Sequence, residues 1–184
     1  IENHQKDYIN PSNIILMVNP SAKREQSPDS NFSSFHHSNI NDRHLRFLTM
    51  KTSTFWRNLY GSYVTDLFSD VVESVMDNLI SAVKDDNKKD YRKQSYKKLI
   101  EQLEILSQDS KEEKLNIYVC GALSKSKRKD FIFFIEELIE EISENSDLNI
   151  ELSFYAVYHP GYQNLKKLIQ GGCEKIVKHS MKVE

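Results

Sequence analysis

The sequence predicts an α/β fold, in which a parallel sheet carries helices on both faces. Residues 14–18 form an unbroken apolar run, rich in β-branched residues, that suits a strand buried on both faces. Segments of strand character then alternate along the chain with segments of helical periodicity, which is typical of a parallel sheet. The 184 residues fit one domain with an ample core, so we treat 1–184 as a single domain.

The composition argues against several classes of protein. A net charge of −2 with 28% charged residues speaks against a strongly basic nucleic-acid binder, although a local basic face stays compatible with it. The two cysteines, Cys120 and Cys173, lack zinc or iron–sulfur spacing, and Cys120 lies in an apolar run typical of a core residue. No apolar run approaches the roughly 20 residues of a membrane span. With reduced thiols and no secretory leader, we expect a cytoplasmic monomer without cofactor or membrane partner.

The first strand is predicted over residues 13–18 and ends abruptly at Asn19-Pro20-Ser21. Pro20 has no amide hydrogen and cannot continue a central strand. Ligands of open parallel sheets bind outside the carboxyl ends of the strands, so Asn19 would stand at the mouth of a site. A plain strand-to-loop turn is the alternative.

A long loop is predicted over residues 23–42, which are dense in Ser, Asn and Asp. Loops of this length are usually functional or disordered. Phe32 and Phe35 within it either tuck onto the core or line a ligand site. A short helix follows, with Thr52 or Ser53 as its cap and Gly61 at its end.

The middle of the chain predicts a strand and two helices. Residues 62–68 read as the second strand, with a polar end at Thr65-Asp66, and residues 70–83 have helical spacing. The charge-rich stretch 84–98 is interpreted as a solvated loop and helix face. The second helix continues from there through Leu106.

The last third of the chain predicts two more strands and two helices. The third strand covers residues 115–121, and a strongly periodic helix with an acidic outer face covers 131–142. The fourth strand covers 149–158 and ends at His159-Pro160. A last helix is predicted from Leu165 to Val177, with a break at Gly171-Gly172.

The carboxyl ends of these four strands would gather polar residues on one rim. Helix amino termini at the same rim add partial positive charge, which favours phosphate. The rim combines a small amide, a carboxylate, an imidazole and a group of lysines and arginines, which we call the basic collar. Its members are Asn19, Ser21, Lys23, Arg24, Asp66, Lys125, Lys127, Arg128, Lys129, His159 and Asn164.

Several chemistries lack support in the sequence. Neither common Gly-rich phosphate loop is present, nor is the Gly-x-Ser-x-Gly nucleophile elbow. Cys120 has no neighbouring base, and a metal site from His36, His37 and Asp66 has no ligand spacing behind it. What remains is Asn19 facing His159: an amide can orient a water, and an imidazole can stabilise developing oxyanion charge.

The chain resembles the uracil-DNA glycosylase superfamily, nearest its mismatch-specific and divergent single-domain branches. Four landmarks carry the resemblance, in order and over nearly the whole chain. They are Val18-Asn19-Pro20-Ser21, similar to the first active-site motif; Phe55-Trp56-Arg57-Asn58-Leu59-Tyr60, similar to a helix after the long loop; Tyr63-Val64-Thr65-Asp66-Leu67, similar to the second strand; and Tyr158-His159-Pro160-Gly161, similar to the second motif.

The resemblance implies a three-layer α/β/α sandwich with a four-stranded parallel sheet. It also implies hydrolysis of the N-glycosidic bond of a damaged or mismatched, uracil-type base that is flipped out of DNA. By position, Asn19 would hold the water and His159 would support charge on the base. The base pocket would comprise Pro20, Ser21, Phe35, Thr65 and Asp66, and the DNA-binding residues would be Lys23, Arg24, Lys125, Lys127, Arg128, Lys129 and Tyr162.

The chain departs from the family at both motifs. The first motif of the family usually begins with glycine, whereas Met17-Val18 stands here instead. Val18 either crowds the pocket or points into the core. Gly161 replaces the usual serine, and Tyr162 is either a wedge or a helix-start residue. Two further hypotheses therefore stand beside a glycosylase: an inactive glycosylase-fold module that binds nucleic acid or a protein, and an unrelated α/β protein.

Overall fold

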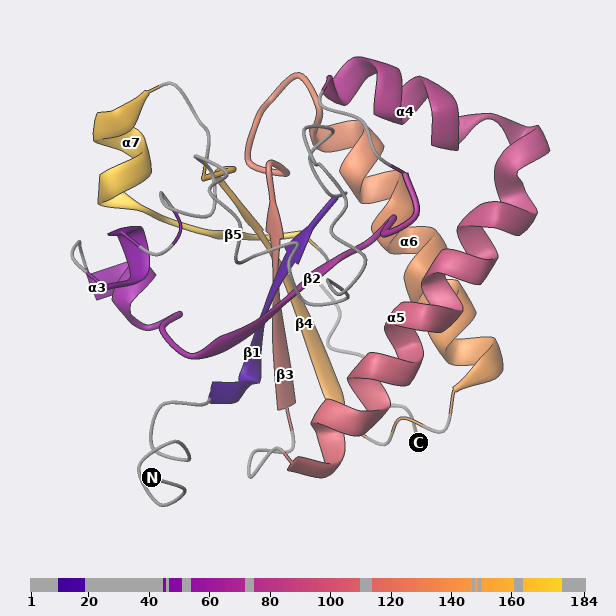
Figure 1. Cartoon of the computed structure of the whole chain (residues 1–184), viewed down its shortest axis with the longest axis horizontal. Helices are drawn as coiled ribbons and strands as arrows, with labels where there is room; N and C mark the ends of the chain where they lie inside the picture. The colour runs from indigo at the N-terminus through magenta and orange to yellow at the C-terminus, as the bar shows by residue number, and fades with distance from the viewer. Residues whose placement is uncertain are drawn as a thin grey trace, which may run out of the picture.

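The protein is built on one five-stranded sheet (Figure 1). The computed structural model describes residues 10–18, 45, 47–50, 54–71, 75–109, 114–146, 148, 150–160 and 164–176. The sheet has the order β2-β1-β3-β4-β5, and β1 to β4 run parallel. The α/β class predicted from the sequence is therefore confirmed. The strands are β1 (Asn10–Met17), β2 (Ser62–Asp66), β3 (Lys114–Cys120), β4 (Glu151–Val157) and β5 (Glu174–Lys175).

The fifth strand corrects the prediction of four. β5 has two residues and pairs antiparallel with β4. The last helix, predicted to run to residue 177, ends instead at Gln170 as α7 (Leu165–Gln170). Gly171 and Gly172 follow with φ of 66° and 132°, so the chain leaves the helix there and returns beside β4. A two-residue strand of Glu and Lys has no periodicity, which is why the sequence pattern missed it.

Helices cover both faces of the sheet (Figure 1). The helix α5 (Lys89–Asp109) and the helix α6 (Arg128–Asn145) lie on one face, whereas α3 (Thr54–Arg57) and α7 lie on the other. The helix α4 (Met76–Lys84) and the short 3₁₀ helix η2 (Asp86–Lys88) lead into α5. In the described part of the chain, no helix has the length and apolarity needed to cross a membrane.

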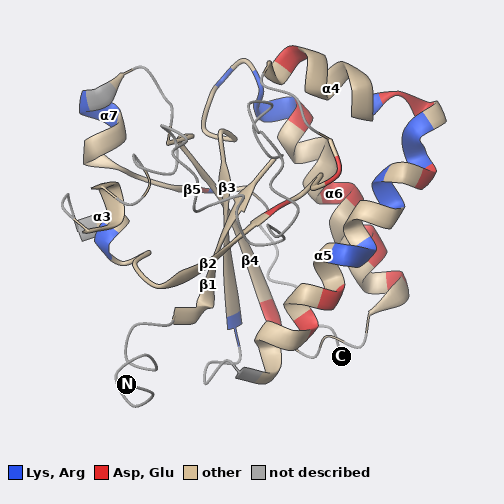
Figure 2. Ribbon diagram, viewed as in Figure 1, with Lys and Arg blue, Asp and Glu red and all other residues tan. Residues whose placement is uncertain are grey.

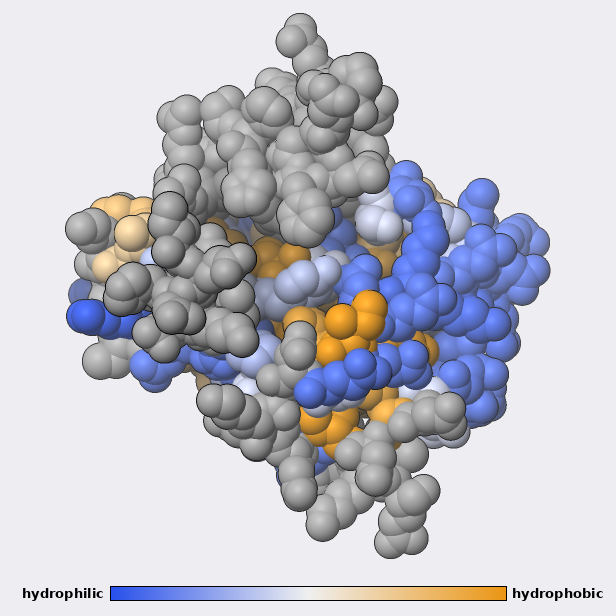
Figure 3. Space-filling model, turned by 60° about the horizontal axis from the view of Figure 1, so that its bottom comes forward, coloured by the Kyte–Doolittle hydropathy of each residue, from blue (hydrophilic) through white to orange (hydrophobic). Residues whose placement is uncertain are grey.

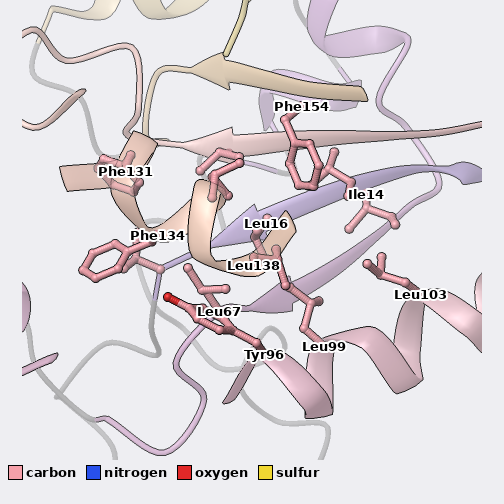
Figure 4. Close-up of a cluster of buried hydrophobic side chains, with 14 of the residues drawn as sticks. Ile14, Leu16, Leu67, Tyr96, Leu99, Leu103, Phe131, Phe134, Leu138 and Phe154 are labelled. Atoms are coloured by element: carbon pink, nitrogen blue, oxygen red, sulfur yellow. The ribbon is translucent and has the colours of Figure 1, made fainter. Parts of the chain in front are cut away.

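Two hydrophobic cores lie on opposite faces of the sheet, and β1 contributes to both. Ile14 and Leu16 point into the core beneath α5 and α6, whereas Ile15 and Met17 point into the core beneath α3 and α7. Figure 4 shows the first core, where side chains of β1 and β4 meet those of α5 and α6. Each fully buried aliphatic side chain contributes about 1.5–3 kcal/mol. The prediction of a first strand buried on both faces is confirmed.

The charge-rich stretch 84–98 forms the end of α4, η2 and the first half of α5. Most of its side chains are exposed, and the space-filling view shows a hydrophilic surface on the side where α4, α5 and α6 lie (Figure 3). The interpretation as a solvated loop and helix face thus holds for most of the stretch. Arg92, Ser95 and Tyr96 are exceptions, because they are only 1%, 5% and 1% exposed.

Candidate functional site at the carboxyl ends of the strands

The strand order places a topological switch point at the carboxyl end of β1. From β1 the chain goes to β2 on one side, and from β2 it crosses to β3 on the other side. In open α/β sheets, ligands bind where neighbouring connections diverge in this way. The ends of β1 to β4 lie at the upper edge of the sheet in Figure 1, together with the start of α6.

Thr65 and Asp66 face opposite sides of the sheet. Thr65 is in register with Leu16, which points toward α5 and α6, and Asp66 is in register with Met17, which points toward α3 and α7. The hydroxyl of Thr65 donates a hydrogen bond of 2.7 Å to Oε1 of Gln102 in α5. Thr65 thus braces β2 against α5, while Asp66 is the member of the pair that ends the strand at the rim.

Cys120 is a buried, protonated thiol. It is fully buried at the end of β3. Burial first, and the nearby carboxylate of Asp66 second, raise the pKa of Cys120 to about 12. The thiolate needed for a nucleophile is therefore scarce at neutral pH. The prediction that Cys120 is a small core residue is confirmed, and the influence of Asp66 shows that the ends of β2 and β3 are electrostatically close.

His159 stands two residues beyond β4, beside the turn that follows β3. The amides of Gly121 and Leu123 donate to the carbonyl of Val157 at 2.9 and 3.3 Å, which ties this turn to the end of β4. Gly121 has a φ of 93°, and a Cβ there would lie 3.9 Å from Cβ of His159 and 3.2 Å from Cζ of Phe131. Glycine thus allows both the backbone turn and the close approach to His159.

The imidazole of His159 is neutral at physiological pH. It is partly buried, and loss of hydration lowers its pKa to about 4. A neutral imidazole still carries one ring N–H, which can donate a hydrogen bond to an oxygen that gains negative charge. The location and charge state of His159 therefore suit an electrophilic role rather than that of a fixed cation.

The part of the basic collar that follows β3 consists of Lys125, Lys127, Arg128 and Lys129 (Figure 2). Among the described residues, only some of these cations form ion pairs with carboxylates. Lys127 forms an ion pair with Asp77 of α4, and Arg128 forms one with Glu174 of β5. Lys125 and Lys129 are exposed and have no ion pair within the described residues. The sequence predicted all four of these cations as DNA-binding residues. The structure shows that two of them have their charge compensated locally.

Val18 and Asn164 have structural roles that the sequence left open. Val18 is 4% exposed and belongs to the core beneath α5 and α6, while its carbonyl accepts from the amide of Phe68 at 2.8 Å. Of the two alternatives for Val18, the structure therefore selects the core. The side chain of Asn164 accepts from the amide of Lys167 at 3.1 Å and caps α7.

The remaining predicted residues lie outside the part of the chain that the structure describes. They are Asn19, Pro20, Ser21, Lys23, Arg24, Phe35 and Tyr162. The juxtaposition of Asn19 with His159 consequently stays a prediction. Among the described residues, no group of three or more His, Cys, Asp or Glu side chains could hold a metal ion.

Comparison with known proteins identifies no family for this chain. No family model matches it, and no curated protein or solved structure matches it. The resemblance to uracil-DNA glycosylases thus stays a prediction that depends on the motifs quoted above. What the structure adds is the placement of Asp66, Gly121 and His159 along one edge of a parallel sheet.

Proposed function

We propose that the protein is a DNA glycosylase-like enzyme that hydrolyses the N-glycosidic bond of a flipped, uracil-type base at the carboxyl edge of its sheet. The observation that carries this proposal is the placement of His159. Its imidazole has a lowered pKa and lies beside the turn at Gly121, just after the strand that leads into the second motif. The proposal also relies on the sequence position of Asn19, which directly follows the buried Val18 and lies two residues beyond β1 in the chain.

The reaction requires a water and a stabilised leaving group. The water oxygen forms a bond to C1′ of the sugar as the bond from C1′ to the base nitrogen breaks. The electron pair passes to the base, where it is shared between ring nitrogen and carbonyl oxygen, and a proton of the water leaves for solvent or the base. A neutral His159 donates its N–H to that oxygen as charge develops, and Asn19 orients the water.

A neutral His159 serves this role without a change of protonation. Its lowered pKa of about 4 keeps the imidazole uncharged over the whole physiological range. A hydrogen-bond donor that is already in place stabilises developing charge without further reorganisation. Removal of one such donor in a well-organised site typically costs about 10²–10³ in rate.

The first experiment measures base release from labelled oligonucleotides. Substrates carry uracil, hypoxanthine, or G·U and G·T mismatches in single and double strands, and alkali then cleaves the abasic sites. The parent is compared with Asn19→Ala and His159→Asn. We expect release by the parent and a loss of about 10²-fold or more in both variants.

Asn13→Ala is the matched control, because Asn13 lies within β1, four residues before the strand ends at Met17. Its side chain accepts from Asn116 at 3.1 Å and donates to the carbonyl of Asn58 at 3.4 Å, away from the rim. This variant is expected to release the base at the parental rate. Failure of the folded parent to release any of the bases overturns the proposed activity and favours the binding module.

A further inference from the structure

We propose that the phosphate backbone of DNA crosses the rim between two pairs of lysines that have no ion pair within the described residues, Lys125 with Lys129 and Lys166 with Lys167, and so passes over the end of β4. We call these four residues the rim lysines. The inference rests on the proposed function for its choice of DNA as partner, and it names the residues that hold the backbone. Lys166 and Lys167 come from α7, which the sequence motifs do not mark as a binding element.

The first pair, Lys125 and Lys129, differs from the two cations between them, which form ion pairs. Lys127 and Arg128 lie between Lys125 and Lys129 in sequence, and both are held by carboxylates of other elements, Asp77 and Glu174. These ion pairs attach the loop after β3 to α4 and β5. Lys125 and Lys129 are exposed and without an ion pair in the described structure. The loop is thus anchored by two cations while it presents the other two to solvent.

The second pair sits on a short helix that tertiary contacts hold in place. The indole Nε1 of Trp56 donates to the carbonyl of Leu168 at 2.6 Å, and Asn164 caps the start of α7. Phe55 packs so closely on Gly171 that a Cβ there would lie 2.6 Å from its Cδ1. Lys166 and Lys167 are exposed on this anchored helix and have no ion pair within the described residues. Their direction is therefore set by the fold.

The two pairs flank the same strand end from opposite faces of the sheet. α6 follows the loop of Lys125 and covers one face, whereas α7 covers the other (Figure 1). Figure 2 shows basic residues both at the start of α6 and on α7, near the upper edge of the sheet. His159 stands two residues beyond β4. In the sheet, β4 lies between β3, which precedes the loop of Lys125, and β5, which follows α7.

Local ion pairs concern the charge of this edge, where Asp66 also ends β2, in a chain of net charge −2. Three nearby carboxylates already form ion pairs: Asp77 with Lys127, Asp130 with Lys84, and Glu174 with Arg128. Within the described structure the rim lysines have no ion pair, and a lysine ammonium is a strong point charge for phosphate. Such a patch attracts a polyanion whatever the net charge of the protein.

The test is the salt dependence of binding to undamaged duplex DNA, measured by fluorescence anisotropy with the full chain. Variants are Lys125→Gln/Lys129→Gln and Lys166→Gln/Lys167→Gln. The matched control is Lys88→Gln/Lys89→Gln, which removes the same charge from two exposed lysines at the corner between η2 and α5. Each phosphate contact contributes about 0.9 to the slope of log K against log salt, so each rim pair is expected to lower the slope by about 1.8.

The outcomes separate this inference from the proposed activity. Lower slopes in both rim variants, with a parental slope in the control, support the path over β4. Three results overturn the proposed path of the DNA backbone. The first is a lowered salt slope in the Lys125/Lys129 variant alone, and the second is an equal loss of slope in the control variant. The third is a parent protein that binds no DNA but binds an acidic protein. If DNA binding depends on all four rim lysines but no base is released, the inference stands and the proposed activity fails.

Discussion

The guanidinium of Arg92 in α5 and the carboxylate of Glu137 in α6 form a two-point ion pair, with Nε to Oε2 at 2.7 Å and Nη2 to Oε1 at 2.8 Å. Nη1 of Arg92 donates to the carbonyls of Val83 and Asp85, both at 2.8 Å, and the hydroxyl of Tyr96 donates to Glu137 at 2.9 Å. Burial favours a raised pKa for Glu137, but the hydrogen bonds from Arg92 and Tyr96 outweigh it and its pKa is lowered. This cluster joins α4, α5 and α6 into one layer.

Arg92→Met is expected to lower the free energy of unfolding by about 3–5 kcal/mol, because it leaves a half-buried carboxylate and two carbonyls without their donor. Urea unfolding measures this change. Lys97→Met is the control, since Lys97 is exposed and lies 4.0 Å from its partner Glu141. The control is expected to cost less than about 1 kcal/mol. Equal losses in the two variants would show that the buried pair has no special role.

Gly171→Ala is expected to destabilise the protein more than Gly172→Ala. Both glycines have positive φ, 66° and 132°, so both substitutions strain the backbone. At Gly171 the new Cβ also meets Cδ1 of Phe55 at 2.6 Å, whereas at Gly172 it meets nothing within 4 Å. Overpacking of this kind typically costs about 1–3 kcal/mol. Thermal or urea unfolding of the two variants isolates this contact, and identical stabilities would contradict it.

Thr65→Val and Asp66→Asn are expected to affect different properties. Thr65→Val loses the hydrogen bond to Gln102 and lowers the free energy of unfolding by about 1 kcal/mol, but it leaves base release unchanged. Asp66→Asn adds an amide donor where the carboxylate only accepts, so it is expected to change the preference among substrate bases. Release rates on uracil and hypoxanthine measure the preference. An unchanged ratio for Asp66→Asn would remove Asp66 from the base pocket.

The stability of the protein is expected to fall as the pH is lowered from about 6.5 to about 4. The pKa of His159 is about 4 in the folded state and 6.5 without the loss of hydration. In this range the unfolded chain binds the proton and the folded chain does not, which favours unfolding by at most roughly 1.4 kcal/mol per pH unit. His159→Asn is expected to show a shallower decline of the unfolding free energy between these pH values. The same slope in both proteins would mean that His159 is hydrated in the folded state.

Local patterns were sufficient for the main elements of the fold. The apolar run 14–18 identified β1, and the helical spacing of Phe131, Phe134 and Leu138 identified α6, because periodic burial leaves a direct trace in sequence. β5 left no such trace, since two charged residues pair with β4 only after the glycines redirect the chain. The burial of Arg92 was also invisible, because its partner Glu137 is 45 residues away.

In the candidate site, too, some features follow from local sequence and others only from contacts between distant residues. Sequence alone determined that polar residues end or follow the strands, among them Asp66 and His159, because strand ends are marked by local composition. Only the tertiary structure decided that Thr65 faces α5 and that Gly121 approaches His159. It also decided that Lys127 and Arg128 form ion pairs, whereas Lys125 and Lys129 form none with the residues that the structure describes. Side-chain direction, hydration and ion pairing depend on elements distant in the chain, so they are properties of the assembled fold.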